Sequence, residues 1–327
     1  MYFPSLPSLT FDSISGKNII VLDLEWNQGS GGTENSSIPF EIIEIGAVKL
    51  DGEGRILSTF DRLVRPQVYK RIHFMTRKII HLRMRDLEDA EDFTAVMEDF
   101  LSWCGENFLF ATWGTLDLTE LQYNMQFYEM EPLSDGPFPY LDAQKLFSLH
   151  FEDGKSRRAL EYAVDFLELH KDEAFHRADS DAWYASLILQ KILGTGSSRR
   201  VSFDVFHLPR DKDHELHIRF DTYSKYISRE FADKHSALSD PEVLSCRCAF
   251  CNSKTRRRID WYTLNSRHYL CLCACRTHGL QRGKIRIKKS ESGGVYVMKT
   301  IRRPSREEAA LMYEQEKKSR LRKKYIK

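Results

Sequence analysis

The fold of this chain is decided by the stretch Ile19-Ile20-Val21-Leu22-Asp23-Leu24-Glu25-Trp26. Four apolar residues lead directly into two carboxylates, and this pattern predicts a strand over 18–26. Alternate side chains of a strand share a face, so Asp23 and Glu25 point the same way, about 6–7 Å apart. Two like charges on one face repel each other unless a cation lies between them. The pair therefore either belongs to a metal site or ends a strand in a solvated turn.

The residues after this strand predict an α/β domain. Apolar runs at 42–50 and 56–64 flank Asp51-Gly52-Glu53-Gly54, and Asp-Gly between such runs is a hairpin signal. The first three strands are therefore expected to form an antiparallel meander. Helical periodicity follows over 74–104, and two more strand-like runs then alternate with helices up to Gly194. This order indicates a mixed five-stranded sheet flanked by helices.

Charge is distributed unevenly, although the 327-residue chain carries a formal net charge of only +2. Residues 246–327 hold 23 Lys and Arg against 6 Asp and Glu, a net charge of +17. The residues before them hold 26 Lys and Arg against 41 Asp and Glu, a net charge of −15. Such asymmetry predicts that the basic part contacts a polyanion, with nucleic acid as the expected partner. The alternative is a tail that only adds solubility.

The sequence lacks the signals of a membrane or secreted protein. No stretch approaches the roughly 18 consecutive apolar residues that a membrane span needs. Residues 1–5 do not begin a basic region followed by an apolar run, so a cytoplasmic location is expected. In that compartment clustered cysteines indicate metal ligands rather than disulfides.

Six of the seven cysteines lie in a basic segment near the C-terminus, in two knuckle-like groups. Zinc takes four thiolate or imidazole ligands in a tetrahedron, and two short groups brought together by hairpins supply them. The expected ligands are Cys248, Cys251, Cys273 and Cys275, with Cys246, Cys271 and His278 as alternatives. Basic and aromatic residues over 254–262 lie between the groups. They favour a zinc-ribbon-like nucleic-acid-binding module, and a zinc-stabilised protein-docking module is the alternative.

Three residues further along the chain complete a candidate site with Asp23 and Glu25. Asp117 follows a predicted strand that ends at Trp113-Gly114. Asp181 lies at the start of a predicted helix, and His176 precedes it by five residues on the turn that leads into that helix. Two-metal hydrolysis of a phosphodiester needs several converging carboxylates and a group that takes a proton from water. These residue types and this order fit that chemistry.

The set Asp23-x-Glu25, Asp117 and His176-x4-Asp181 resembles the DEDDh (DnaQ-like) 3′–5′ exonuclease family over residues 17–195. The resemblance implies an RNase H-like fold and two Mg²⁺ or Mn²⁺ ions held by the four carboxylates. It also implies that His176 is the general base for hydrolysis at the 3′ end of single-stranded nucleic acid. The rival interpretation is a catalytically inactive nuclease fold that binds nucleic acid or acts as an adaptor.

A narrower resemblance concerns the substrate. The phrase Ala111-Thr112-Trp113-Gly114-Thr115-Leu116-Asp117 is similar to the branch that contains histone-mRNA and small-RNA exonucleases and KapD-type proteins. On that basis RNA is favoured over DNA. Trp26 departs from the family pattern, because many relatives have a small or hydroxylated residue there, near the 3′-terminal nucleotide.

Four segments are predicted along the chain. An exonuclease-like domain over 17–195 is followed by a connecting segment over 196–245. A zinc-ribbon-like module over 246–302 precedes a basic helix over 303–327. The start of this helix is marked by a capping box, in which Ser305 is followed three residues later by a glutamate.

Overall fold

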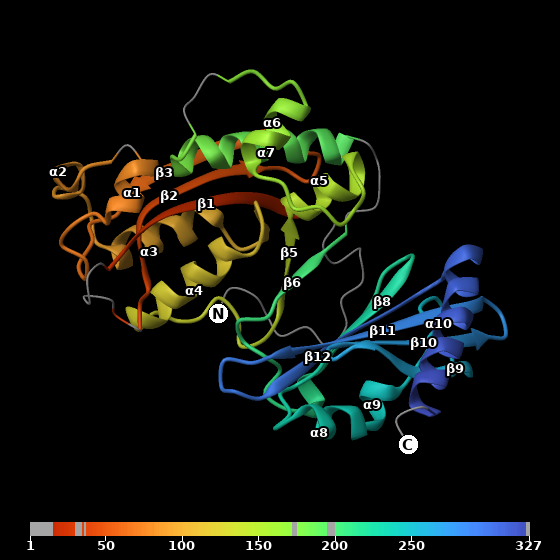
Figure 1. Cartoon of the computed structure of the whole chain (residues 1–327). Helices are drawn as coiled ribbons and strands as arrows, with labels where there is room; N and C mark the ends of the chain where they lie inside the picture. The colour runs from red at the N-terminus through yellow and green to blue at the C-terminus, as the bar shows by residue number, and fades with distance from the viewer. Residues whose placement is uncertain are drawn as a thin grey trace. The chain divides into compact units, whose positions relative to one another are not determined.

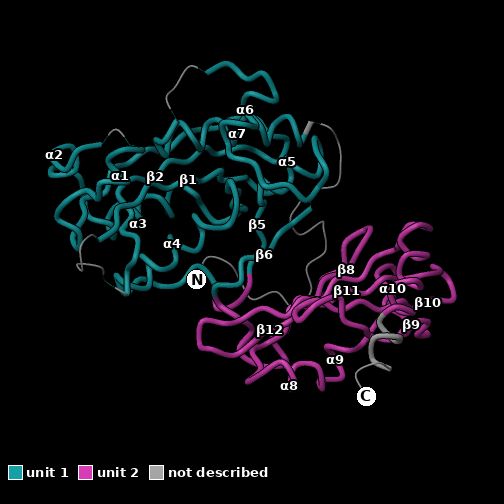
Figure 2. The backbone as a smooth tube through the Cα atoms, viewed as in Figure 1, with its two compact units in different colours: residues 1–4, 15–134, 138–206 teal, residues 5–14, 135–137, 207–327 magenta. Residues whose placement is uncertain are grey.

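The computed structural model describes residues 16–29, 35, 37–80, 82–171, 175–194 and 200–324. The chain forms two compact units (Figure 2). The N-terminal unit is built mainly from Ser15–Ser134 and Phe138–Phe206, and the C-terminal unit mainly from His207–Lys327. Within the described ranges, no helix is both long and apolar enough to span a membrane.

The N-terminal unit contains a mixed sheet with the strand order β3-β2-β1-β4-β5-β6 (Figure 1). The first three strands form the expected antiparallel meander, and β4 and β5 run parallel to β1. The sheet has six strands rather than the five expected, because β6 adds to its edge antiparallel to β5. The strands are β1 (Asn18–Gln28), β2 (Phe40–Leu50), β3 (Ile56–Leu63), β4 (Phe108–Thr112), β5 (Phe138–Asp142) and β6 (Ser202–Asp204).

Helices cover both faces of this sheet. The helices are α1 (Phe74–Ile79), α2 (Met84–Leu87), α3 (Phe93–Cys104), α4 (Leu116–Phe127), α5 (Ala143–Phe151), α6 (Leu160–Phe166) and α7 (Ala178–Gly194). Helices α3 and α4 lie on one face and α7 on the other (Figure 1). Residues Ile20, Leu22 and Leu24 of β1 join a core cluster with side chains of α3 and α4. Because strand side chains alternate, Asp23 and Glu25 point to the opposite face, which α7 covers.

The helical structure expected over 74–104 is present as three separate helices. The backbone of Ile80 is extended and ends α1. The side chain of Asp92 accepts a hydrogen bond from the N–H of Ala95 and caps a new helix at α3. Local capping therefore interrupts a periodicity that alone would favour one helix.

The C-terminal unit contains a second six-stranded sheet, with the order β7-β8-β12-β11-β10-β9 and antiparallel pairing throughout. The segment 196–245, expected to be a connection, is divided: β6 joins the first sheet and β7 and β8 join the second. The expected C-terminal helix is present as α10, with the capping box between Ser305 and Glu308. The elements are β7 (Leu216–Arg219), β8 (Tyr223–Ile227), α8 (Lys234–Ser239), α9 (Pro241–Leu244), β9 (Arg256–Asn265), β10 (His268–Cys275), β11 (Gly279–Lys289), β12 (Val295–Arg302) and α10 (Arg306–Lys324).

Candidate active site and thiol clusters

Three of the predicted carboxylates meet above the middle of the first sheet. Asp23 and Glu25 lie on β1, and Asp181 lies in the first turn of α7. One oxygen from each lies within 4.8 Å of an oxygen of the other two. The strand supplies two of these carboxylates on one face, and the helix supplies the third from above.

Asp117 adds a fourth carboxylate close to the same strand. It lies in the first turn of α4, is only 7 % exposed, and accepts a hydrogen bond from the backbone N–H of Leu24. It is not among the three carboxylates whose oxygens lie within 4.8 Å of one another. Its charge nevertheless acts on Asp23, and after burial it is the strongest cause of the raised Asp23 pKa.

The electrostatics of these four groups fit a cation site. Burial is the first cause that raises the pKa of each carboxyl group, and repulsion from nearby carboxylates adds to it. The pKa is raised to about 8 for Glu25, about 7 for Asp117 and about 6 for Asp181, and well above its ordinary value for Asp23. Ionised carboxylates crowded in this way require neutralising charge.

One carboxylate oxygen of Asp181 indicates where a cation would bind. Oδ1 of Asp181 is buried and has no hydrogen-bond partner among the described residues. A buried carboxylate oxygen without a partner is costly unless a cation binds it. Because all the donors are carboxylate oxygens, the set suits Mg²⁺ or Mn²⁺ better than a soft metal.

His176 lies on the turn that leads into α7, as expected. Its φ angle of +67° lies in the left-handed region, which is uncommon for a residue other than glycine. Its backbone N–H donates to Oδ2 of Asp181 over 3.3 Å, and its side chain is exposed. The turn thus places an accessible imidazole next to one of the three converging carboxylates.

An ion pair between Glu44 and Arg177, which was not predicted from the sequence, positions the start of α7. The Glu44 side chain on β2 is fully buried, and Nε of Arg177 donates to its Oε1 over 2.8 Å. The backbone N–H of Ala178 donates to the other carboxylate oxygen. Since Glu44 is paired with Glu25 across the β1–β2 ladder, this contact holds the first turn of α7 against the carboxylates. In the sequence, the only sign of this ion pair is a charged residue inside the apolar run of β2.

Gly46 allows α7 to approach the sheet. It lies opposite Asp23 in the β1–β2 register. A Cβ atom at this position would overlap the backbone of Ala178 and Asp179. Only a residue without a side chain permits this close approach, and the approach brings Asp181 to β1.

Trp26 lies at an irregularity of β1, because the register with β2 shifts between Glu25 and Trp26. The side chain is partly buried, packs against the main core cluster and lies beside Phe40, with 5.8 Å between ring centroids. A bulge next to a site changes the direction of the following side chain. The Trp26 ring therefore contributes to packing at the end of the strand.

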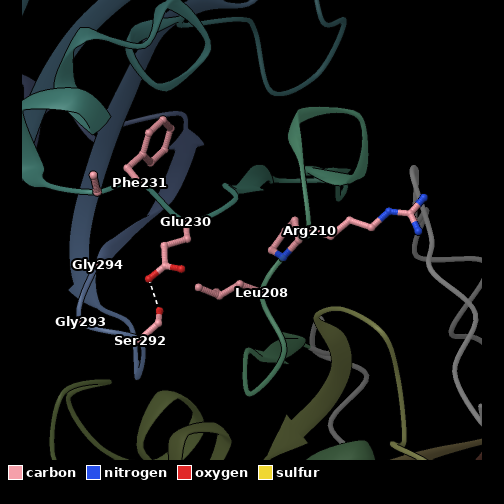
Figure 3. A pocket seen from close by; sticks show the side chains of 9 residues that line it. Leu208, Arg210, Glu230, Phe231, Ser292, Gly293 and Gly294 are labelled. Carbon is pink, nitrogen blue, oxygen red and sulfur yellow. Dashed lines mark hydrogen bonds between the residues drawn. The ribbon is translucent and has the colours of Figure 1, made fainter.

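A pocket of about 740 Å³ lies in the C-terminal unit (Figure 3). Leu208, Arg210, Glu230 and Phe231 contribute to its wall. The Glu230 carboxylate accepts hydrogen bonds from the hydroxyl groups of Ser290 and Ser292. Glu230 is the only carboxylate among the residues that line the pocket, so its lining offers no converging acidic groups for the predicted hydrolysis.

Among the described residues of the C-terminal unit, four side chains that could hold a zinc ion lie together. Cys248, Cys251, Cys275 and His278 lie within 4.8 Å of one another through their ligand atoms. The Sγ atoms of Cys251 and Cys275 are 3.7 Å apart, and Nδ1 of His278 lies 3.5 Å from Sγ of Cys248. A tetrahedron with zinc–sulfur bonds of about 2.3 Å has edges of about 3.8 Å, and edges to nitrogen are slightly shorter. The spacing fits zinc.

This set differs from the expected ligands at one position. Cys273 lies with Cys246 and Cys271 in a second cluster, and His278 completes the first cluster in its place. Cys271 and Cys273 are two residues apart on β10 and share a face, and their Sγ atoms are 3.8 Å apart. The turn after Cys275 returns His278 to within 3.7 Å of that cysteine. Spacing alone does not reveal this turn.

Comparison with known proteins agrees with the fold of the N-terminal unit. The family model described as "Exonuclease" (RNase_T) matches residues 20–189. No curated protein sequence matches the chain. The nuclease domain of 3′hExo, described as a DEDDh family member bound to rAMP, is 18 % identical with a TM-score of 0.50. The match covers 57 % of this chain and 96 % of that one, and shows a shared fold.

Two further solved structures resemble the chain with TM-scores below 0.5. Cell-death related nuclease 4 is 19 % identical with a TM-score of 0.49, over 63 % of this chain and 69 % of that chain. Exonuclease I of E. coli, in complex with a dA16 oligonucleotide, is 10 % identical with a TM-score of 0.43. That match covers 55 % of this chain and 41 % of the other.

Proposed function

Since the chain belongs to the exonuclease family, whose model covers residues 20–189, we propose that its N-terminal unit is a metal-dependent 3′–5′ exonuclease that acts on single-stranded nucleic acid. The observation that carries the proposal is the convergence of Asp23, Glu25 and Asp181, with Asp117 behind them. Four carboxylates around one place are costly for a protein that does not bind cations there.

Each residue has a role that its position supports. Asp23, Glu25, Asp117 and Asp181 would hold the divalent cations. Such cations stabilise the charge that develops on the phosphate and lower the pKa of the attacking water. His176 accepts the proton of that water, because its imidazole is exposed beside Asp181 and imidazole exchanges protons near neutral pH. Glu44 and Arg177 are positioning residues that hold the start of α7.

RNA is the proposed substrate. The support is the resemblance of Ala111–Asp117 to the branch that contains histone-mRNA exonucleases, together with the fold shared with the nuclease domain of 3′hExo, which was solved with rAMP. DNA is the alternative substrate, since the chemistry of the carboxylate site does not distinguish the two sugars. Trp26, next to Glu25, is the residue at which we expect the sugar or base of the 3′ nucleotide to be selected.

We also propose one structural zinc ion at Cys248, Cys251, Cys275 and His278. The Sγ and Nδ1 separations of 3.5–3.7 Å support this ligand set. A tetrahedral zinc would join the segment before β9 to the end of β10 and so stabilise the sheet. Protein side chains would take all four coordination positions of this zinc ion, so the ion takes no part in hydrolysis.

The test uses matched RNA and DNA strands of one sequence, labelled at the 5′ end, with Mg²⁺ or Mn²⁺. The proposal predicts a ladder of products shortened from the 3′ end, with RNA degraded faster. A 3′-terminal phosphate on a control strand should delay the ladder. Strands that stay intact with either metal would favour the inactive nucleic-acid-binding or adaptor protein, and products cut internally would exclude an exonuclease.

A further inference from the structure

A row of four cations lies on one face of β11. Its members, which we call the β11 cation row, are Arg282, Lys284, Arg286 and Lys288. They are two residues apart on a strand, so their side chains share a face over about 20 Å. The intervening Gly283, Ile285 and Ile287 are buried, whereas Arg286 and Lys288 are exposed and the other two cations are half-buried.

The row lies on the face that α8 and α9 do not cover. On the opposite face, Ile285 and Ile287 pack in a cluster with Ala237 of α8 and Val243 of α9. Figure 1 shows these two helices on one side of the second sheet. On the face of the row, α10 packs through Met312 over residues of β9 and β10. The cation row lies on β11, beside the strip that α10 covers.

Neighbouring strands extend the positive charge. Arg302 of β12 is paired with Arg282, and His268 of β10 is paired with Arg286. Residues paired directly across a ladder point to the same face. Thr300 is paired with Lys284 and adds a hydroxyl group, so the register places no carboxylate directly opposite Arg282, Lys284 or Arg286.

Positive charges repel one another along the row, although Glu308 lies close enough to act on Arg282. Among the described residues, Arg282, Lys284 and Arg286 form no ion pair. Burial lowers the pKa of Lys284 to about 8, and the charges that lower it further are Arg286, Arg282 and Arg302. Arg302 has a partner in Glu308. A bound polyanion would relieve the repulsion among these side chains.

We propose that the β11 cation row binds the phosphodiester backbone of single-stranded nucleic acid. The inference deepens the proposed function, because the bound strand would be the substrate of the N-terminal unit. A regular line of Lys and Arg on a sheet face can follow a chain of phosphates without reading its bases. The basic residues over 254–262, which the sequence had favoured for this role, are a weaker candidate since Arg257 is paired with Asp260 over 2.6 Å.

The test compares two double variants with the same loss of charge. Arg286→Ala with Lys288→Ala removes two exposed members of the row. The matched control is Arg219→Ala with Lys289→Ala, because both residues are exposed cations of the same sheet whose register places them on the other face. All proteins are full-length and carry Asp23→Ala, so that the strand is not degraded. Equal zinc content and circular dichroism verify their folding.

Binding is measured by fluorescence anisotropy with a labelled 20-nucleotide oligouridine strand across a salt series. Each phosphate contact contributes about 0.7 to the slope of log K against log salt for single strands. The row variant should therefore lose about 1.4 of slope and bind about 25-fold more weakly at 0.1 M salt. The control should remain within about twofold of the parent. Equal weakening of both variants, or weakening of neither, would overturn the proposal.

The outcome separates this proposal from the proposed function. If the chain with native Asp23 degrades strands while the row variant binds as tightly as its parent, the row is rejected and the exonuclease remains. If the chain with native Asp23 degrades no strand, and only the row variant loses affinity, the row stands as a binding surface. The exonuclease is then rejected.

Discussion

Replacing Asp181 with asparagine should stabilise the metal-free protein at pH 8 and abolish its nuclease activity. The substitution keeps the shape of the side chain and removes one of the crowded charges. Burial, and to a lesser extent nearby carboxylates such as Asp179 and Glu44, raise the pKa of Asp181 to about 6, from an ordinary value of 3.8. Ionisation of this group therefore destabilises the folded protein. Asparagine removes this destabilisation, and it also removes one of the proposed metal ligands.

The size of the effect follows from the pKa. One pKa unit corresponds to about 1.4 kcal/mol, so ionised Asp181 destabilises the folded state by up to about 3 kcal/mol. Below about pH 4 the carboxyl group is protonated in both folded and unfolded chains, and the substitution gains nothing. Because the folded pKa is raised, stability of the wild type is lost as the pH rises from about 4 to about 6. The advantage of asparagine should be complete above that range.

Hydrogen exchange of peptides from β1 and α7 measures this effect within the full chain, in buffer without added divalent ions. Asp99→Asn, an exposed position on α3, is the control and should change little at any pH. Saturating Mg²⁺ or Mn²⁺ should reverse the order of stability, because it binds the wild-type site more tightly. An Asp181→Asn variant that is no more stable at pH 8, or equally stabilised at pH 4 and pH 8, would refute the argument.

Three further predictions concern the scaffold. Gly46→Ala should push the start of α7 away from β2 and reduce the rate of hydrolysis about 100-fold, whereas Gly136→Ala, with open space around the new Cβ, should leave the rate unchanged. Arg177→Met should lower the free energy of unfolding by about 3–5 kcal/mol in a denaturant titration, because it leaves a buried carboxylate unpaired; an unchanged midpoint would contradict this. Cys251→Ser should lose the one zinc ion per chain that elemental analysis finds in the wild type, while Cys104→Ser retains it; zinc retained by both would reject the ligand set.

The fold of the N-terminal unit was predictable where the pattern is local. Short apolar runs and an Asp-Gly turn define β1, β2 and β3. Two features escaped this reasoning. Strand β6 has only three residues, Ser202–Asp204, too few to show a period. The cap at Asp92 divides a helical pattern that is otherwise continuous in the sequence.

Some residues of the candidate site were likewise predictable from the sequence, and others were not. Asp23 and Glu25 are visible because two carboxylates follow an apolar run on one strand. The pairing that holds α7 in place is not visible in the sequence, since Glu44 and Arg177 are 133 residues apart in the chain. The role of Gly46 depends on which helix lies above it. His278 joins the thiol cluster through a turn, whereas Cys273 lies in the second cluster with Cys246 and Cys271.

The central claim is that β1, α4 and α7 place their carboxylates in one hydrolytic site. Its most direct test is the single-turnover rate at which the full-length protein shortens a 5′-labelled single-stranded RNA with Mg²⁺ or Mn²⁺, compared with the rate of Asp23→Ala. We expect progressive loss of nucleotides from the 3′ end by the wild type. The rate of the variant should fall by at least about 100-fold, with its fold and zinc content intact. Equal rates for the two proteins would contradict the claim.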